Sequence, residues 1–213
     1  MKPTLNEIDL YFITDSNLTK KTILDDVKAV IKAGVKIIQY REKDKSIKVM
    51  LKEAKEIKGL CDKNNVLLII NDNVDICKSI DADGVHLGIK DLSYKQAREL
   101  LKDKIIGLTI HNVEEATKAE ELGADYIGVS PIFETKTKLD AGPAAGLKLI
   151  KDIKKAVEIP QVAIGGINLE NIDSIINAGA TSAAVISAII TKDDVEAECR
   201  KFINKLASQI KSS

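Results

Sequence analysis

Residues 35–43 have the sequence Val35-Lys-Ile-Ile-Gln-Tyr-Arg-Glu-Lys43, and the rest of the chain can be organised around this stretch. The β-branched start of this stretch is typical of a strand. Because side chains alternate between the faces of a strand, Gln39, Arg41 and Lys43 share one face. An amide, a guanidinium and an ammonium at the carboxyl end of a strand suit a multiply charged anion, since arginine pairs with two phosphate oxygens at once. The alternative is a strand that runs into a charged loop, and these residues alone do not decide between the two.

Apolar runs of strand type alternate with helical patterns on both sides of this stretch. The expected strands are 9–14, 35–43, 66–70, 84–87, 105–109, 126–130, 161–164 and 183–187, each followed by a helical pattern. Eight such units predict an α/β protein, a (β/α)8 TIM barrel with residues 1–213 as a single domain. A doubly wound open sheet is the alternative, but its glycine-rich first turn is missing, because the first strand ends with Ile13-Thr-Asp-Ser16.

Composition sets the kinds of partner to expect. The 213 residues are 45% hydrophobic and 30% charged, which is ordinary for a globular protein, and 32 basic residues balance 32 acidic ones. With this balance the chain has no overall positive charge that would attract nucleic acid or a membrane surface, so an anion must be held by a local site. The start of the chain has no apolar run of signal-peptide type, and Cys61 and Cys199 fall in helical patterns, where they are expected as buried thiols. We therefore expect a cytoplasmic enzyme that acts on small molecules, without nucleic-acid or membrane partners. The sequence leaves homo-oligomer formation open.

In a barrel of this kind the active site is built at the carboxyl ends of the strands. Asp72 and Asp91 follow successive strands there, close to the face that carries Arg41 and Lys43. Mg²⁺ is commonly held by one or two carboxylates together with substrate phosphates. These residues predict a magnesium and pyrophosphate site, the alternative being that Asp72 caps the next helix and Asp91 opens a loop.

A second group of residues follows the sixth to eighth strands. Thr135, Thr137 and Lys138 supply two hydroxyls and a cation, while Gly165-Gly166 and Ile186-Ser187 supply backbone N–H groups where barrels often bind a phosphate. Two anion sites in one barrel mouth predict a transferase that joins two phosphorylated substrates.

Several motifs at these strand ends resemble those of thiamine phosphate synthases, and they cover nearly the whole chain in order. The matching stretches are Gln39-Tyr-Arg-Glu-Lys43, Ile70-Asn71-Asp72, Asp83-Gly-Val-His-Leu-Gly88 with Asp91, Gly128-Val-Ser-Pro-Ile-Phe133, Thr135-Lys-Thr-Lys138, Val162-Ala-Ile-Gly-Gly-Ile167 and Val185-Ile-Ser-Ala188. The family joins hydroxymethylpyrimidine diphosphate to thiazole phosphate and releases pyrophosphate.

The resemblance implies a role for each matching residue. Asp72 and Asp91 would hold Mg²⁺, and Arg41, Lys43 and Lys138 would be catalytic by neutralising the diphosphate. The pyrimidine diphosphate would be bound by Gln39, Tyr40, Arg41, Glu42, Lys43, Asn71 and Thr109, with Lys138 reaching toward it. The thiazole phosphate would be bound by Thr135, Thr137, Gly166, Ile186 and Ser187, and Lys136 is expected among the substrate-binding residues.

Two other functions are compatible with parts of this pattern. A thiazole tautomerase would share the barrel and the thiazole phosphate site, and His111 at the barrel mouth could move its proton, but it would have little use for Asp72, Asp91 or the cationic face. A non-catalytic phosphate-binding barrel is the other alternative. His86 is expected as a histidine at a strand end whose ring is satisfied by backbone groups, and the role of His111 stays open.

Overall fold

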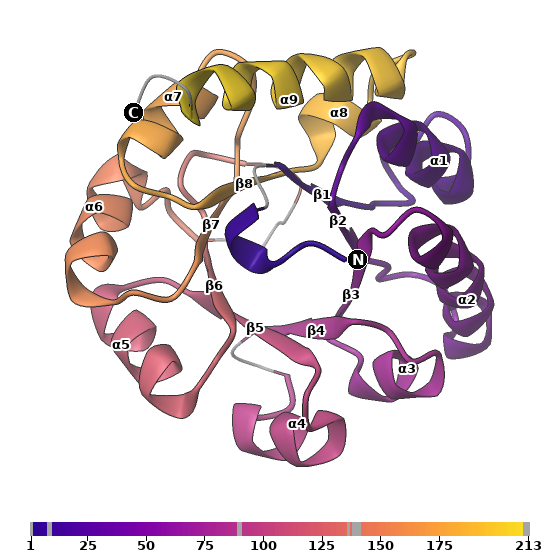
Figure 1. The fold of residues 1–213 in the computed structure, drawn as a ribbon, viewed down its shortest axis with the longest axis horizontal. Coiled ribbons are helices and arrows are strands. Elements are labelled where there is room, and N and C mark those ends of the chain that lie inside the picture. The colour runs from indigo at the N-terminus through magenta and orange to yellow at the C-terminus, as the bar shows by residue number, and fades with distance from the viewer. Residues whose placement is uncertain (1, 8–9, 89–90, 136, 138–141, 211–213) are drawn as a thin grey trace.

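The computed structural model describes residues 2–7, 10–88, 91–135, 137 and 142–210, and it is a closed barrel of eight parallel strands (Figure 1). Each strand pairs with the next in the chain, and β1 pairs with β8 to close the barrel. This confirms the predicted (β/α)8 fold. The strands are β1 (Leu10–Ile13), β2 (Ile37–Tyr40), β3 (Leu67–Asn71), β4 (Gly84–Leu87), β5 (Ile105–Ile110), β6 (Tyr126–Val129), β7 (Gln161–Ile164) and β8 (Ser182–Val185).

The helices form a ring around the strands, and the short 3-10 helix η1 (Leu5–Glu7) lies across the end of the barrel that faces the viewer in Figure 1. Because η1 comes directly before β1, this is the amino-terminal end of the strands, and Leu5 packs against the residues inside it. The helices are α1 (Ile23–Ala33), α2 (Ile47–Lys63), α3 (Val74–Ser79), α4 (Tyr94–Leu101), α5 (Val113–Leu122), α6 (Gly146–Ala156), α7 (Ile172–Asn177), α8 (Ser187–Ile190) and α9 (Val195–Ile210).

Capping residues set several helix ends where the sequence predicts them. The side chain of Asn112 accepts a hydrogen bond of 2.8 Å from the backbone N–H of Glu115, and Ser93 accepts one of 3.4 Å from Gln96. Each bond satisfies an N–H group that the first helical turn leaves without a partner. α1 and α5 end at Gly34 and Gly123, whose positive φ values (107° and 85°) favour glycine.

Two strands end at least two residues earlier than the sequence pattern suggests, while β1 and β6 end one residue early. β2 stops at Tyr40 rather than at residue 43, because the N–H of Arg41 donates to the side chain of Thr14 (2.9 Å) instead of continuing the backbone ladder. β8 stops at Val185, and Ser187 begins α8. Arg41, Lys43 and Ser187 therefore lie in the segments that follow their strands, at the end of the barrel opposite η1.

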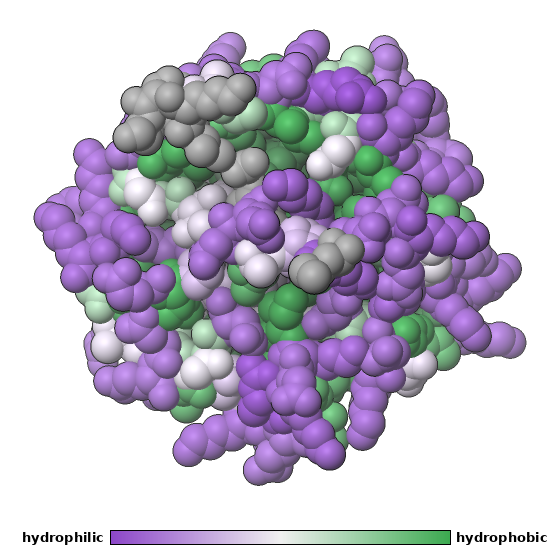
Figure 2. Space-filling view, in the orientation of Figure 1, coloured by the Kyte–Doolittle hydropathy of each residue, from purple (hydrophilic) through white to green (hydrophobic). Residues whose placement is uncertain are grey.

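The core consists of two layers. The outer layer packs strands against helices and includes the fully buried thiols Cys61 and Cys199, as predicted. The inner layer fills the barrel with Tyr11, Ile13, Ile37, Leu67, Ile69, Tyr126, Val162 and Ala184. The face shown in Figure 2 is mostly hydrophilic with scattered apolar residues, and no helix within the described ranges is long and apolar enough to cross a membrane.

Two glycines make room for rings inside the barrel. A Cβ atom on Gly107 would lie 2.1 Å from the ring of Tyr126, and one on Gly128 would lie 2.9 Å from the ring of His86. Both distances are shorter than side-chain contacts allow, so Tyr126 and His86 can lie across the interior only because residues 107 and 128 have no side chain.

Candidate active site

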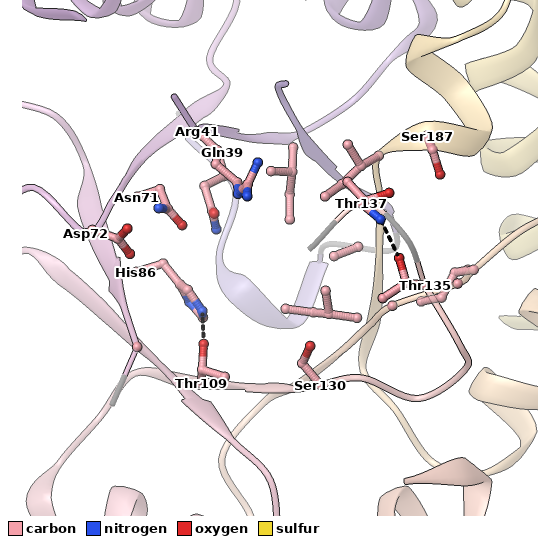
Figure 3. Close-up of a pocket in the computed structure, with 18 of the residues that line it drawn as sticks. Gln39, Arg41, Asn71, Asp72, His86, Thr109, Ser130, Thr135, Thr137 and Ser187 are labelled. Atoms are coloured by element: carbon pink, nitrogen blue, oxygen red, sulfur yellow. Dashed lines mark hydrogen bonds between the residues drawn. The ribbon is translucent and has the colours of Figure 1, made fainter. Parts of the chain in front are cut away.

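A cavity of about 740 Å³ opens at the carboxyl ends of the strands (Figure 3). All eight strands or the segments after them contribute to it, as expected for the active-site end of such a barrel. Its lining consists of Ile13, Gln39, Arg41, Lys43, Asn71, Asp72, His86, Gly88, Asp91, Thr109, His111, Ser130, Thr135, Thr137, Ile164, Gly165, Gly166, Ile167, Ala184, Ile186 and Ser187.

Arg41 is held at the cavity by β1. Its Nη1 lies 2.7 Å from Oδ2 of Asp15, and the two side chains are only 15% and 8% exposed. Thr14 bonds the backbone of Arg41 twice, since its Oγ1 accepts from the N–H and donates to the carbonyl (3.1 Å). One edge of the guanidinium is thus fixed by a carboxylate, and the side chain still lines the cavity.

The two predicted metal ligands lie together beside Lys43. Nζ of Lys43 is 2.5 Å from Oδ2 of Asp72, and Asp91 Oδ2 accepts a 2.6 Å hydrogen bond from the N–H of Gly88. Burial, and next a hydrogen bond with Asp72, raise the pKa of Asp91, so the two carboxyl groups are close enough to disfavour a second negative charge.

The capping alternative for Asp72 is wrong. The N-cap of α3 is Asn73, whose side chain accepts the N–H of Ile76 at 2.8 Å. Asp72 itself has a positive φ of 61° and its carboxylate faces Lys43. No group of three or more His, Cys, Asp or Glu side chains suited to a metal occurs within the described residues, so additional ligands would have to come from a substrate or from water.

Below these charges, polar side chains lie on the inner wall. Gln39 and His86 are 2% and 5% exposed, and both line the cavity with Asn71 and Thr109. The ring nitrogens of His86 lie 3.0 Å from Oη of Tyr126 and 2.9 Å from Oγ1 of Thr109. Side chains therefore occupy the positions where backbone partners were expected for this histidine.

Hydroxyl groups and glycines form the opposite side of the cavity. The N–H of Thr137 donates to Oγ1 of Thr135 (3.2 Å), and Ser187 lies on the same side of the view as these two residues in Figure 3. Gly165 and Gly166 have φ values of 104° and 65°, which favour glycine. A Cβ atom on Gly166 would lie 2.5 Å from the backbone carbonyl oxygen of Glu134, so the segments after β6 and β7 touch through bare backbone.

Two side chains predicted to bind substrate do not line the cavity, and this placement corrects their assignment. Tyr40 is 1% exposed and donates a 2.8 Å hydrogen bond to Glu53 of α2, on the outer side of the strand. Glu42 accepts from the backbone N–H groups of Lys43 and Asp44 and is 7% exposed. Alternation along β2 turns Tyr40 away from Gln39. Glu42 lies beyond the end of β2, and its carboxylate is held by the backbone N–H groups of the two residues that follow it. Lys136 and Lys138 lie outside the described residues.

Asp15 supports the site without lining the cavity, and it was not singled out from the sequence. It holds Arg41, and its position directly after the expected first strand was a signal of the same kind as Asp72 after the third. His111, expected at the barrel mouth, does line the cavity, with Nδ1 3.3 Å from Glu115. Gly165, expected beside Gly166, lines it too, and the lining residues without a role predicted from the sequence are Ile13, Gly88, Ser130, Ile164, Ile167 and Ala184.

The thiamine monophosphate synthase family model matches residues 10–189, a range that includes all eight strands. The chain belongs to this family. Among its relatives, the thiamine-phosphate synthase of Methanosarcina barkeri is 49% identical over 203 residues, covering 95% of this chain and 92% of the relative. That of Syntrophomonas wolfei is 45% identical, covering 92% of this chain and 95% of the relative.

A solved structure supports the same membership. The thiamine phosphate pyrophosphorylase from Pyrococcus furiosus superposes with a TM-score of 0.90 at 34% identity, over 97% of this chain and 98% of that one. The predicted resemblance is therefore confirmed, and with it the prediction of a thiamine phosphate synthase, a transferase of thiamine biosynthesis. The tautomerase and the non-catalytic barrel are correspondingly disfavoured.

Proposed function

We propose that the protein joins 4-amino-2-methyl-5-hydroxymethylpyrimidine diphosphate to 4-methyl-5-(2-phosphoethyl)thiazole, with thiamine phosphate and pyrophosphate as products. The observation that carries this proposal is a single cavity with two unlike sides. Arg41, Lys43 and two carboxylates line the side of β2 to β4, while hydroxyls and glycines line the side of β6 to β8. Each side suits one of the two phosphorylated substrates, and both open into the same space.

Asp72 and Asp91 fit a Mg²⁺ ion that arrives with the diphosphate. Burial, and next its neighbour Asp72, raise the pKa of Asp91, and a divalent cation held by these two residues would favour the charged form of both carboxyl groups. Two carboxylates leave room for diphosphate oxygens and water, the coordination Mg²⁺ prefers. When bound, the ion would supply positive charge to the departing pyrophosphate.

The side chains on this side of the cavity would assist departure of pyrophosphate. The bond between the pyrimidinylmethyl carbon and the diphosphate oxygen breaks, and its electron pair leaves with pyrophosphate. Arg41 and Lys43 can neutralise that charge, which is the main demand on the site. Because Asp15 fixes one edge of Arg41, the remaining N–H groups need little reorganisation to meet the diphosphate.

The thiazole nitrogen then attacks the pyrimidinylmethyl carbon with its own lone pair, so the reaction needs no nucleophilic side chain. Thr135, Thr137, Gly166, Ile186 and Ser187 are proposed to hold the phosphate of the thiazole and so to aim its ring at that carbon. Holding both substrates in one geometry is itself a large part of such a catalysis.

Product analysis tests the proposal. The protein is mixed with both phosphorylated substrates and Mg²⁺, and thiamine phosphate and pyrophosphate are quantified. Equal amounts of the two products are expected, dependent on both substrates and abolished by a chelator. Proton exchange on the thiazole without condensation would support a tautomerase instead, and binding without any turnover would support a non-catalytic barrel.

We also propose that residues 1–213 act as one domain on these small phosphorylated substrates in the cytoplasm. The three cysteines are buried free thiols, which suits a reducing compartment. The balanced charge of the chain supports the absence of nucleic-acid and membrane partners.

A further inference from the structure

A chain of hydrogen bonds crosses the barrel interior beneath the cavity. Nε2 of Gln39 donates to Oη of Tyr11 (3.0 Å), which lies 2.8 Å from Oη of Tyr126. Tyr126 is 3.0 Å from Nδ1 of His86, and Nε2 of His86 is 2.9 Å from Oγ1 of Thr109. The chain begins and ends at residues that line the cavity, Gln39 and Thr109, while the two tyrosines are 1% and 0% exposed.

The direction of these bonds follows from the Gln39 end. The amide nitrogen of Gln39 can only donate, so the Tyr11 oxygen accepts there. The buried hydroxyl proton of Tyr11 then needs an acceptor, and the Tyr126 oxygen is the one placed to accept it. Tyr126 in turn donates to Nδ1 of His86. If Tyr126 donated to Tyr11 instead, the Tyr11 proton would be buried without an acceptor in this series of hydrogen bonds, which costs free energy.

An imidazole without charge at His86 would pass this direction on. An imidazole that accepts at Nδ1 carries its proton on Nε2, so Nε2 donates to Oγ1 of Thr109. The hydroxyl proton of Thr109 is then available to a group in the cavity. At the other end, Gln39 has turned its nitrogen toward Tyr11, so its amide oxygen is available as an acceptor.

We propose that Tyr11 and Tyr126 are positioning residues that fix Gln39 as an acceptor and Thr109 as a donor toward the pyrimidine. An aminopyrimidine presents the complementary edge, since its amino group donates and its adjacent ring nitrogen accepts. A 4-oxo pyrimidine presents the opposite edge, with a carbonyl acceptor beside a ring N–H donor. The inference rests on the proposed function, because the aminopyrimidine is a substrate of that reaction.

The tautomer of His86 tests the direction without any assay of activity. The chain has two histidines, so ¹⁵N labelling of histidine in the full protein gives a simple spectrum, and a His111→Asn variant assigns it. At about pH 8.5, where an ordinary histidine is neutral, we expect a protonated Nε2 and an unprotonated Nδ1 for His86. A protonated Nδ1 would mean that the Gln39 amide is flipped and that every hydrogen bond in the series runs in the opposite direction. That result would overturn the proposal, and so would a mixture of the two tautomers.

The role of the tyrosines is tested with Tyr126→Phe and Tyr11→Phe, which keep the ring and remove the hydroxyl. We expect KM for the pyrimidine diphosphate to rise on the order of tenfold, with KM for the thiazole phosphate unchanged. Competition by the 4-oxo analogue of the pyrimidine diphosphate gives a second readout. In the wild type the analogue should bind on the order of 100-fold more weakly than the 4-amino substrate, and this difference should shrink in Tyr126→Phe. The His86 signals of Tyr126→Phe should also lose their single tautomer.

Tyr94→Phe is the matched control, because its hydroxyl donates to the carbonyl of Gly123 outside the barrel (2.5 Å). It should leave both KM values and the discrimination unchanged. Equal effects of Tyr126→Phe on both substrates, or unchanged discrimination, would reduce the tyrosines to structural residues and overturn the proposal. If the wild type made no thiamine phosphate, the proposed function would fail, whereas the His86 tautomer could still be read, so the two failures are distinguishable.

Discussion

Replacing Arg41 by lysine tests the cationic side of the cavity directly. Nη1 of Arg41 is 2.7 Å from the carboxylate of Asp15, which is only 8% exposed and needs a positive partner. The planar guanidinium can serve Asp15 with one edge and the diphosphate with its other N–H groups. A lysine has a single ammonium, which Asp15 would attract away from the diphosphate. Arg41→Lys should therefore leave one cation fewer to neutralise the pyrophosphate as it departs.

The size of the effect follows from the bond that is lost. A hydrogen bond to a charged group contributes about 1.5–3 kcal/mol, so kcat should fall about 10- to 100-fold. The free energy of unfolding should change by only about 0.5 kcal/mol, since a positive charge remains beside Asp15. Arg41→Ala differs in this respect, because it leaves a mostly buried carboxylate unpaired and should cost about 3 kcal/mol of stability.

Steady-state release of pyrophosphate at saturating thiazole phosphate measures kcat, and urea denaturation measures stability. Tyr40→Phe is the control, since the hydroxyl of Tyr40 bonds Glu53 on the outer side of β2. It should keep kcat within about twofold. The reasoning is refuted if Arg41→Lys keeps the wild-type kcat, or if Tyr40→Phe loses more activity than Arg41→Lys.

Four further substitutions test other parts of the molecule. Asp72→Asn and Asp91→Asn should each lower turnover at least about tenfold and raise the Mg²⁺ concentration needed for half-maximal rate; an unchanged Mg²⁺ titration in both variants would contradict the metal assignment. Ser187→Glu should place a negative charge beside the thiazole phosphate and raise KM for that substrate, and equal increases in both KM values would argue against two separate sides. Burial raises the pKa of Asp26, which is 2% exposed, with no partner for Oδ2 among the described residues. A raised native pKa means that the folded state binds the proton more tightly than the unfolded chain, so ionised Asp26 lowers stability at neutral pH. Asp26→Asn should therefore stabilise the protein at pH 7 by on the order of 1 kcal/mol, and urea denaturation should show the gain vanishing by about pH 3; an equal gain at both pH values would contradict this account.

Much of the fold could be predicted because each strand carries its own local signal. Apolar runs, capping residues and glycines at helix ends all lie within a few residues of the element they define, so they can be read in order. The end of β2 could not be predicted this way. It depends on Thr14, 27 residues earlier, whose side chain takes the N–H of Arg41 out of the ladder.

The site shows the same division between local and distant causes. Strand alternation predicted that Gln39 and Arg41 lie at the cavity, and they do. The same alternation argued against Tyr40, which was assigned to the site only because it lies inside the matching family motif. The bond between Tyr11 and Tyr126 joins residues 115 positions apart, and two apolar-looking strands give no hint of it. Asp15 lay within reach of sequence reasoning, since it follows a strand end as Asp72 does.

The glycines inside the barrel also limit how this sequence can change over time. The ring of Tyr126 occupies the volume that a side chain on Gly107 would need, and the ring of His86 does the same at Gly128. Gain of a methyl group at either glycine therefore requires the facing ring to become smaller first, and at Gly128 the Cδ1 of Ile164, also 2.9 Å from the Cβ position, would have to move as well, so each pair shows strong epistasis. Evolutionary drift at these four positions must proceed by paired replacements in a fixed order, with the ring lost first and the glycine second.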